Sequence, residues 1–412
     1  MRSPRTELLL FLPAIFVLVV GAASTAKAQP EKPNILFVMV DDLGKEWISA
    51  YGAEKIETPN VDRLAETGMR FENAYSMPQC TPTRVTLLTG QYPYRHGWTN
   101  HFDVPRWGSG AHFDPARNAS FARLLRKAGY ATAIAGKWQI DDFRVEPYAL
   151  EEAGFDAWSV WTGGEGGNIE KSQHRYWDPY VHEGTADHAE SRTREEYGPD
   201  IYADFLIDFM EAHREEPMLL YFPMCLTHGP LVTTPAQPNA SGTEGRFKAM
   251  VRYMDTLVGR LLDALEAQGL REETIVVFTT DNGTMGRQTG LRNGRPVQGA
   301  KSEMREPGVA MPFIVSGPSM VPEGRVTSAL TDFTDVLPTF AELAGNEPSS
   351  EWTVDGVSIA SLLLGESQET PRDWIYAQGG NSAAFENGRV VPAQAYDARV
   401  IRNERWKLWV SE

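Results

Sequence analysis

The sequence contains little of three things that mark common classes of protein: cysteine, net positive charge and long apolar segments. Only 2 of its 412 residues are cysteine, and its net charge is −16 at pH 7. Two cysteines are too few for a disulfide-rich scaffold, and an acidic chain is a poor candidate for binding nucleic acid through its phosphates. The composition, 42% hydrophobic and 23% charged, is instead that of a globular enzyme.

One apolar run stands near the start of the chain. Arg2 and Arg5 precede an apolar segment over Leu8–Val20, and Ala26–Ala28 offers a cleavage site of small residues. The apolar segment is shorter than the ~20 residues that a membrane-spanning helix needs, and the order of features is typical of a secretory signal peptide. We predict that residues 1–28 are removed and that the protein is exported, either periplasmic or secreted, and does not span a membrane.

From Asn34 onward, apolar runs alternate with amphipathic helical patterns. The apolar runs cover 35–40, 130–135, 218–226, 274–280 and 312–316. The clearest helix is predicted over 246–268, with its apolar residues on one face. Fully apolar strands that alternate with helices indicate an α/β fold, a large and mostly parallel sheet sandwiched by helices.

The pattern divides the chain into parts. We predict a catalytic domain over 29–350 and a small C-terminal α+β subdomain over 351–412, with short strands at 374–378, 399–402 and 406–410. The Gly-rich and charged segments 163–199 and 284–300 interrupt the alternation, and we interpret them as long loops.

Polar residues follow four of the apolar runs. The residues at these ends are Asp41, Asp42, Lys137, His228, Asp281 and Asn282. Ligands of open α/β sheets bind beyond the carboxyl ends of the strands, and clustered carboxylate and amide oxygens suit Ca²⁺ or Mg²⁺. An acidic pair can also merely end a strand or cap a helix. Two such pairs on separate strands favour a metal site.

Cys80 begins a segment that reads as a short helix, because Pro82 fits a first helical turn and Gly90 fits a helix end. A thiol at a helix N-terminus is a candidate for a low-pKa nucleophile. The alternatives are an incidental cysteine on a capped helix, or a disulfide to Cys225. The contexts of the two cysteines differ, since Cys225 lies in an apolar run and Cys80 in a polar turn.

The pattern Cys80-x-Pro82-x-Arg84, followed by Leu88-Thr89-Gly90, resembles the signature of the type I, formylglycine-dependent sulfatases of the alkaline phosphatase superfamily. Other stretches similar to motifs of this family are 34–44, 136–138, 227–230, 280–283 and Lys301 with its followers Glu306, Gly308 and Pro312. The resemblance covers Pro33 to about Gly345 and extends toward Leu408. Related sequences commonly continue further, so we expect the C-terminal subdomain to be incomplete.

The resemblance implies a hydrolase of sulfate esters, similar to arylsulfatases, in which a maturation enzyme oxidises Cys80 to formylglycine. The hydrate of this residue attacks sulfur and displaces the alcohol, and the sulfated hemiacetal then collapses and releases sulfate. The resemblance implies that the family's cation, Ca²⁺ or Mg²⁺, is bound by Asp41, Asp42, Asp281, Asn282 and residue 80. The resemblance also implies that Arg84 stabilises the hydrate and that Lys137 and Lys301 stabilise the charge on the sulfuryl group. His228 or Lys301 would protonate the leaving oxygen.

Gln139 departs from the family pattern, which has a histidine two residues after the first lysine. Glutamine can form hydrogen bonds but cannot take up a proton at neutral pH. The resemblance leaves three alternatives for the release of sulfate: another base takes the place of that histidine, a water does, or turnover is slow. His96 and His101 are candidate bases, although a lone histidine in a loop is more often a surface residue.

The substrate implied is a sulfated glycan or an aryl sulfate. Arg95, His96 and His101 are candidate substrate contacts, and the tryptophans and tyrosines near them and in 158–177 could stack on sugars or, equally, pack in the core. Two other functions remain open. One is hydrolysis of phosphonate or phosphate monoesters, and the other is sulfate binding by a catalytically impaired relative.

Overall fold

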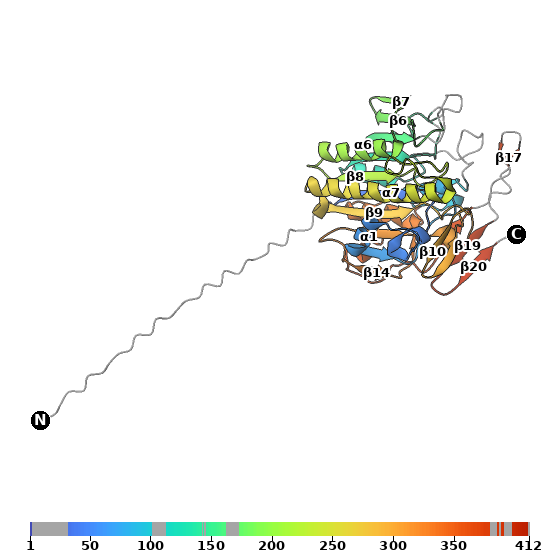
Figure 1. Ribbon diagram of the computed structural model, residues 1–412. Coiled ribbons are helices and arrows are strands. Elements are labelled where there is room, and N and C mark those ends of the chain that lie inside the picture. Colours follow the sequence, from blue (N-terminus) through green and yellow to red (C-terminus); the bar gives the residue numbers. More distant parts are fainter. Residues whose placement is uncertain are drawn as a thin grey trace.

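A ten-stranded sheet forms the centre of the computed structural model (Figure 1). The structure describes Met1 and residues 32–100, 113–141, 143, 146–161, 173–379, 385–386, 389–390 and 398–410. Two predictions fall outside these residues: the signal peptide, apart from Met1, and His101. The strand order is β14-β2-β13-β9-β1-β8-β4-β5-β6-β7, which runs from the bottom to the top of the molecule in Figure 1.

Five neighbouring strands in the middle of the sheet are parallel. They are β9 (Thr274–Thr280), β1 (Asn34–Val40), β8 (Met218–Pro223), β4 (Ala131–Lys137) and β5 (Ala157–Trp161). Every residue of these strands is buried, because helices cover both faces of a parallel sheet. The prediction of a mostly parallel sheet with continuous apolar strands is confirmed.

Helices cover the sheet on both faces. One face carries α1 (Pro59–Glu66), α6 (Gly198–Ala212) and α7 (Gly242–Ala267); the other carries α2 (Cys80–Thr89), α4 (Phe121–Lys127), α5 (Ala149–Ala153), α9 (Val336–Leu343) and α10 (Ala360–Leu363). The side chains of β1 alternate between the two cores, with Phe37 and Met39 in one and Val38 and Val40 in the other. This alternation is the period-two geometry of a strand.

The remaining strands of the sheet are mostly antiparallel. On one side lie β13 (Phe313–Ser316), β2 (Gly68–Phe71) and β14 (Arg325–Thr327), and on the other lie β6 (Tyr180–Thr185) and β7 (Ala189–Thr193). Strands β6 and β7 fall in 163–199, so the prediction of a loop there is wrong for its described part. All residues of β7 are exposed. An edge strand that buries neither face shows no apolar pattern in the sequence.

The segment 284–300 also contains strands. It forms a hairpin of β10 (Thr289–Arg292) and β11 (Arg295–Gln298). Asn293 and Gly294 make the turn with φ angles of 49° and 71°, the positive values that a two-residue hairpin of the Asn-Gly type requires. The interpretation as a loop is therefore wrong, and the Asn-Gly pair was the signal for the hairpin.

A small C-terminal sheet is confirmed. Its three antiparallel strands are β16 (Ile375–Gln378), β19 (Arg399–Arg402) and β20 (Lys407–Val410), and the last two lie at the right of Figure 1. Lys407 fixes this sheet to the main body, because its Nζ lies 2.7 Å from the carbonyl oxygen of Met304 and 2.8 Å from Glu306 Oε1.

Short elements complete the fold. They are the helices α3 (Pro93–His96) and α8 (Glu306–Val309), the 3₁₀ turns Lys45–Trp47, Ser49–Tyr51, Arg271–Glu273 and Phe333–Asp335, and the strands β3 (Ala74–Tyr75), β12 (Ala310–Met311), β15 (Thr331–Asp332), β17 (Phe385–Glu386) and β18 (Arg389–Val390). Among the described residues, no helix combines the length and the apolar character needed to cross a bilayer.

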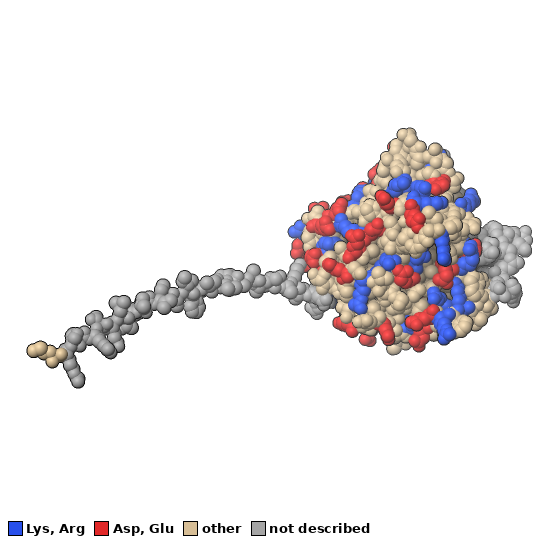
Figure 2. Space-filling model, turned by 60° about the horizontal axis from the view of Figure 1, so that its bottom comes forward, with Lys and Arg blue, Asp and Glu red and all other residues tan. Residues whose placement is uncertain are grey.

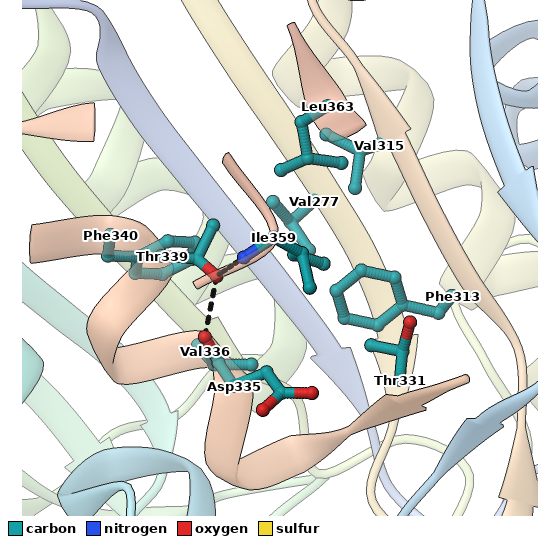
Figure 3. Close-up of a pocket in the computed structure, with 10 residues that line it drawn as sticks. All are labelled: Val277, Phe313, Val315, Thr331, Asp335, Val336, Thr339, Phe340, Ile359 and Leu363. Atoms are coloured by element: carbon teal, nitrogen blue, oxygen red, sulfur yellow. Dashed lines mark hydrogen bonds between the residues drawn. The ribbon is translucent and has the colours of Figure 1, made fainter. Parts of the chain in front are cut away.

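The face of the molecule in Figure 2 and the small cavity beside α9 in Figure 3 give no indication of a substrate site. Acidic and basic side chains are mixed over the face shown in Figure 2. The cavity in Figure 3 lies between the sheet and α9, is lined mainly by apolar side chains such as Val277 and Phe340, and has a volume of about 10 Å³. That is room for about one water molecule.

Candidate active site

Two acidic pairs meet where β1 and β9 end. The strands are parallel neighbours with Val40 opposite Thr280, so Asp41 and Asp281 leave the sheet side by side. The backbone N–H of Asp42 donates to Asp281 Oδ1 over 3.1 Å. Asp41, Asp42, Asp281 and Asn282 are all fully buried. The sequence placed these four residues at one sheet edge, and the structure brings them together.

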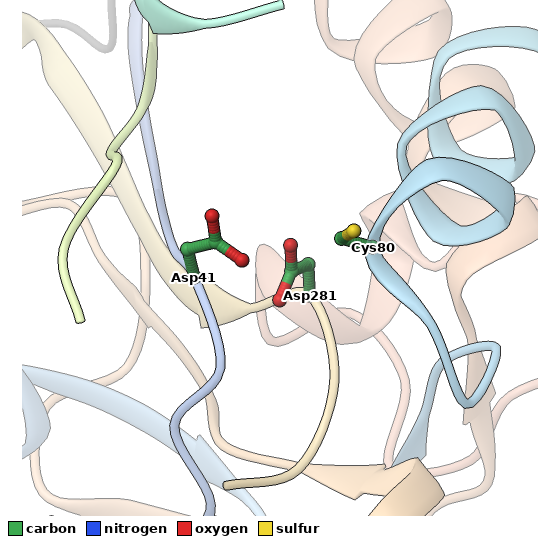
Figure 4. A group of neighbouring side chains, drawn as sticks. All are labelled: Asp41, Cys80 and Asp281. Carbon is green, nitrogen blue, oxygen red and sulfur yellow. The ribbon is translucent and has the colours of Figure 1, made fainter. Parts of the chain in front are cut away.

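Cys80 faces the same space from the first turn of α2. Its Sγ, one oxygen of Asp41 and one of Asp281 all lie within 4.8 Å of one another. Figure 4 shows the three side chains as neighbours. The helix begins at Cys80 and ends at Thr89 with Gly90 after it, as predicted. Both Cys80 and Cys225 are free and buried, so the structure does not support the disulfide alternative.

Each of the three carboxylates is paired with a different basic side chain, and Arg84 Nη2 also lies 3.8 Å from Asp41 Oδ2. Lys137 Nζ lies 2.6 Å from Asp41 Oδ2, and Arg84 Nη2 lies 2.7 Å from Asp281 Oδ2. Lys301 Nζ lies 2.7 Å from Asp42 Oδ2. Arg84 is one turn after Cys80 on α2, and Lys137 ends β4. Three negative and three positive charges are thus enclosed together, next to the thiol.

Two oxygens of this cluster have no hydrogen-bond partner although they are buried: Asp41 Oδ1 and Asn282 Oδ1. The Asn282 amide group donates instead to Asp42 Oδ1 over 2.8 Å and to the carbonyl oxygen of Gly283 over 3.0 Å. An unsatisfied buried oxygen costs about 1–3 kcal/mol. Carboxylate and amide oxygens left open in this way are the donor set of a hard divalent cation, so the residues present fit Ca²⁺ or Mg²⁺.

The pKa shifts follow from the same crowding. Burial, together with the charge of Asp41, raises the pKa of Asp281 to about 7. Burial also works against ionisation of Asp41, but the charges of Lys137, His228 and Arg84 outweigh it and hold its pKa well below the usual range. Asp281 therefore competes for a proton in the metal-free protein, and a bound cation would take the place of that proton.

His228 and Lys301 border the cluster on its more open side. His228 Nε2 is 3.6 Å from Asp42 Oδ2, and its side chain is 27% exposed. Burial and the charge of Lys301 lower the pKa of His228 to about 4. Burial disfavours the charge of Lys301, but Asp42 outweighs that effect and raises the pKa of Lys301 above its usual value. At pH 7 Lys301 therefore carries a proton and the imidazole of His228 is neutral.

Gln139 lies beside the start of α2. Its backbone carbonyl oxygen is 3.5 Å from Thr81 Oγ1, and its side-chain Oε1 is buried without a hydrogen-bond partner.

His96 has a different place from the one predicted. Its Nδ1 accepts a hydrogen bond from the backbone N–H of Trp98 over 3.1 Å, and its Nε2 lies 3.0 Å from Thr86 Oγ1. Burial lowers the pKa of His96 to about 3. With both ring nitrogens occupied, His96 fastens α2 to the following segment. This placement does not support the prediction that His96 contacts substrate or acts as a base.

Most of the candidate aromatic platforms are core residues. Trp98, Trp158, Trp161 and Tyr176 are buried, whereas Trp177 is 42% exposed. Arg95 forms an ion pair with Asp355 over 2.7 Å and leaves 39% of its side chain exposed. Its role as a substrate contact stays a prediction.

Two neighbours of the site escaped the sequence analysis, Arg175 and Thr284. Arg175 Nη1 is 3.2 Å from His228 Nδ1. Thr284 Oγ1 is 2.8 Å from the backbone N–H of Gly44 and 2.6 Å from Glu46 Oε1, so it ties the loop after β9 to the loop after β1. Arg175 precedes β6 in a polar stretch without a motif and gave no signal. Thr284 directly follows the Asp-Asn-Gly motif, and that position was the signal.

Comparisons with known proteins agree with this geometry. The model of the Sulfatase family matches residues 33–346. N-acetylgalactosamine-6-sulfatase of Canis lupus familiaris is 31% identical over 393 residues, 90% of this chain and 74% of the relative. The crystal structure of Ps i-CgsB in complex with k-i-k-neocarrahexaose is 25% identical, with a TM-score of 0.75 and 92% and 84% of the two chains covered.

The fold itself is shared more widely. Phosphonate monoester hydrolase of Agrobacterium radiobacter has 19% identity and a TM-score of 0.65, with 92% of this chain and 87% of that chain covered. Fold and site together define a hydrolase of the alkaline phosphatase superfamily that cleaves sulfate esters. The chain belongs to the Sulfatase family.

Proposed function

We propose that this sulfatase acts through residue 80, converted from cysteine to formylglycine by a maturation enzyme, and through one divalent cation, Ca²⁺ with Mg²⁺ as the alternative. The observation that carries the proposal is the pair of unpartnered buried oxygens, on Asp41 and Asn282, in a cluster that also contains the Cys80 thiol. Asp41, Asp42, Asp281, Asn282 and residue 80 would hold the cation. When bound, the cation would polarise a sulfate oxygen and would favour an ionised hydroxyl group on residue 80.

The basic side chains of the site have different roles in the proposed reaction. Lys137 and Lys301 donate hydrogen bonds to sulfate oxygens, whose charge grows as the ester bond breaks. Arg84 holds the Asp281 carboxylate in place over 2.7 Å and faces the hydroxyl groups of the hydrated residue 80. The protonation states favour Lys301 over His228 as the group that gives the leaving oxygen its proton, because at neutral pH Lys301 carries a proton to give and His228 is neutral.

The second half-reaction is the slower one in this proposal. The release of sulfate from residue 80 requires a base for the remaining hydroxyl group. Gln139 can form hydrogen bonds but cannot take up that proton, so a water carries the proton away. Turnover should therefore be limited by sulfate release and not by cleavage of the ester.

The substrate class that we propose is a sulfated carbohydrate. Two of the similar proteins carry names that refer to an amino sugar and to an oligosaccharide. The predicted signal peptide adds to this, because an exported enzyme, whether periplasmic or secreted, meets extracellular polysaccharides. An aryl sulfate would serve as a synthetic substrate.

The test is a comparison of aryl esters with one leaving group. The sulfate ester should be cleaved with a larger kcat/KM than the matched phosphonate and phosphate monoesters. Dominant phosphonate cleavage would sink the proposal. Single-turnover kinetics test the impaired-relative alternative. A burst of alcohol with no sulfate release would mean that only the first half-reaction works.

A further inference from the structure

We propose that Arg175 forms a second anion-binding subsite beside the sulfate site, and that it takes a second anionic group of the substrate, a carboxylate or another sulfate. This inference rests on the proposed function, because it assumes that the ester sulfate of the same substrate lies at the metal site.

Charge pairing is the first observation. The carboxylates of Asp41, Asp42 and Asp281 are matched by Lys137, Lys301 and Arg84. Arg175 is a fourth cation at this sheet edge, and its side-chain contacts are the imidazole of His228 and the face of Trp161. Within the part of the chain that the structure describes, no carboxylate forms an ion pair with it. The protein thus places more positive charge here than it needs for its own acids.

The position of Arg175 follows from the sheet. Trp161, the last residue of β5, is paired with Lys137 at the end of β4, and the Arg175 guanidinium lies 3.9 Å from the centre of the Trp161 ring. The ring of His228 stands between Arg175 and Asp42, with Nδ1 3.2 Å from Arg175 Nη1 and Nε2 3.6 Å from Asp42 Oδ2. One imidazole ring therefore separates the guanidinium from the metal-site cluster.

The segment that carries Arg175 is held firmly against the histidine loop. The next residue, Tyr176, is buried, and its hydroxyl lies 2.7 Å from the carbonyl oxygen of Cys225 and 2.5 Å from that of His228. Behind it, a Cβ at Gly198 would approach the Arg175 carbonyl oxygen to 2.4 Å, so the packing requires glycine. A cation fixed in this way loses little entropy when an anion binds.

The chemistry of the guanidinium suits this role. Arg175 is partly exposed, its Nε is buried without a hydrogen-bond partner, and Nη2 is not used by His228. A guanidinium stacked on an aromatic ring keeps its charge and presents planar N–H donors, which match the oxygens of a carboxylate or a sulfate. A substrate with a second anion on the same sugar or the adjoining one can engage both subsites.

The test compares matched substrates. We would measure kcat/KM for a monosulfated sugar, for the same sugar with a second sulfate, and for the same sugar linked to a uronate. The wild-type enzyme should prefer at least one dianionic substrate, and Arg175→Gln should lower that preference by about 10-fold or more. Arg175→Lys should restore part of it. Arg214→Gln is the matched control, since Arg214 is exposed and paired with Glu215, and it should keep the wild-type ratio.

The two dianionic substrates separate the sources of the anion, because the preferred one identifies the group that Arg175 binds. Equal loss of kcat/KM on all three substrates in Arg175→Gln would mean that Arg175 only orients His228, and it would overturn the proposal. A wild-type enzyme without any preference would do the same.

Binding measurements distinguish a failure of the Arg175 subsite from a failure of the proposed function. In a Cys80→Ala background, the dianionic ligand should bind about 10-fold more weakly after Arg175→Gln, while the monosulfated ligand should change much less. That result would stand even if catalysis did not proceed through formylglycine. Equal weakening for both ligands would overturn the subsite alone.

Discussion

Two buried clusters of opposite charges lie in this protein, and they differ in how completely their atoms are satisfied. The metal-site cluster consists of Asp41, Asp42, Asp281 and Asn282 with their three basic partners. The Arg372 cluster consists of Asp332, Asp335 and Arg372, which joins the segment after β15 to the chain just before β16. Both are buried, so both need compensation for the loss of water.

In the Arg372 cluster every carboxylate oxygen has partners. Arg372 pairs with both oxygens of Asp335. The other donors to the two carboxylates are the backbone N–H groups of Asp332, Thr334, Val357 and Tyr376 and the hydroxyls of Thr334 and Tyr92. Nothing is left for a ligand, and the cluster only holds elements together.

The metal-site cluster leaves Asp41 Oδ1 and Asn282 Oδ1 open. The difference teaches that buried charge alone does not mark a functional site. The marker is buried charge with donor atoms that the protein does not use, next to a reactive group such as Cys80. The predictions below distinguish the two clusters and run from the largest expected effect to the smallest.

Cys80→Ala should lower turnover by about 10⁴-fold or more, because it removes the nucleophile. The unfolding free energy should change by less than about 1 kcal/mol, since residue 80 sits at the start of α2 and not inside a core. Turnover of an aryl sulfate and urea unfolding measure the two effects. The matched control is Cys225→Ala, in the apolar core below the site, which should keep its turnover. Activity in Cys80→Ala would remove residue 80 from the mechanism.

Arg372→Met should lower the free energy of unfolding by about 3–5 kcal/mol, because it leaves the buried Asp335 carboxylate without its cation. Cation stoichiometry should stay at the wild-type value under native conditions. Urea unfolding and metal analysis of the same sample test both statements. A folded variant that has lost its cation would show that the two clusters are not independent.

Asp281→Asn should weaken Ca²⁺ binding by about 100-fold or more, because it removes a charged ligand. The metal-free protein should change little in stability, because the gain from removing a charge that burial and Asp41 disfavour offsets the weaker pairing with Arg84. Calorimetric titration with Ca²⁺ and thermal unfolding in a chelator give the two values. Wild-type affinity in this variant would contradict the assignment of Asp281 as a ligand.

The smallest effect is a pH dependence of Ca²⁺ affinity. The pKa of Asp281 is raised to about 7 in the metal-free protein, so below pH 7 a cation must displace a proton from it. Affinity should rise with pH by up to about 10-fold per unit between pH 5.5 and 7 and level off above. His228, with a pKa lowered to about 4, stays neutral over this range. A flat affinity profile would contradict the account.

Much of this arrangement was accessible from the sequence, since its strongest signals are local. Continuous apolar runs identified β1 and β9, the residues after them identified the acidic pairs, and Pro82 and Gly90 bounded the helix that begins at Cys80. What the sequence missed depends on tertiary contacts. The edge strand β7 has no buried face to impose a pattern, and in β6 only Tyr180 and Val181 are buried.

His96 shows the same limit at a single residue. In the sequence it is a polar residue near the nucleophile. Only the fold reveals that α2 and the backbone of Trp98 occupy both of its ring nitrogens. Arg175 is the converse case, a residue without a motif that the sheet edge and Tyr176 bring next to His228.

The mass of the peptide that contains residue 80 tests the central claim most directly. The protein should be made together with a formylglycine-generating enzyme, with a second sulfatase converted in the same cells as the control. We predict the mass of an aldehyde in place of the thiol, which would establish the nucleophile beside Asp41 and Asp281. An unmodified cysteine, with the control fully converted, would contradict the account.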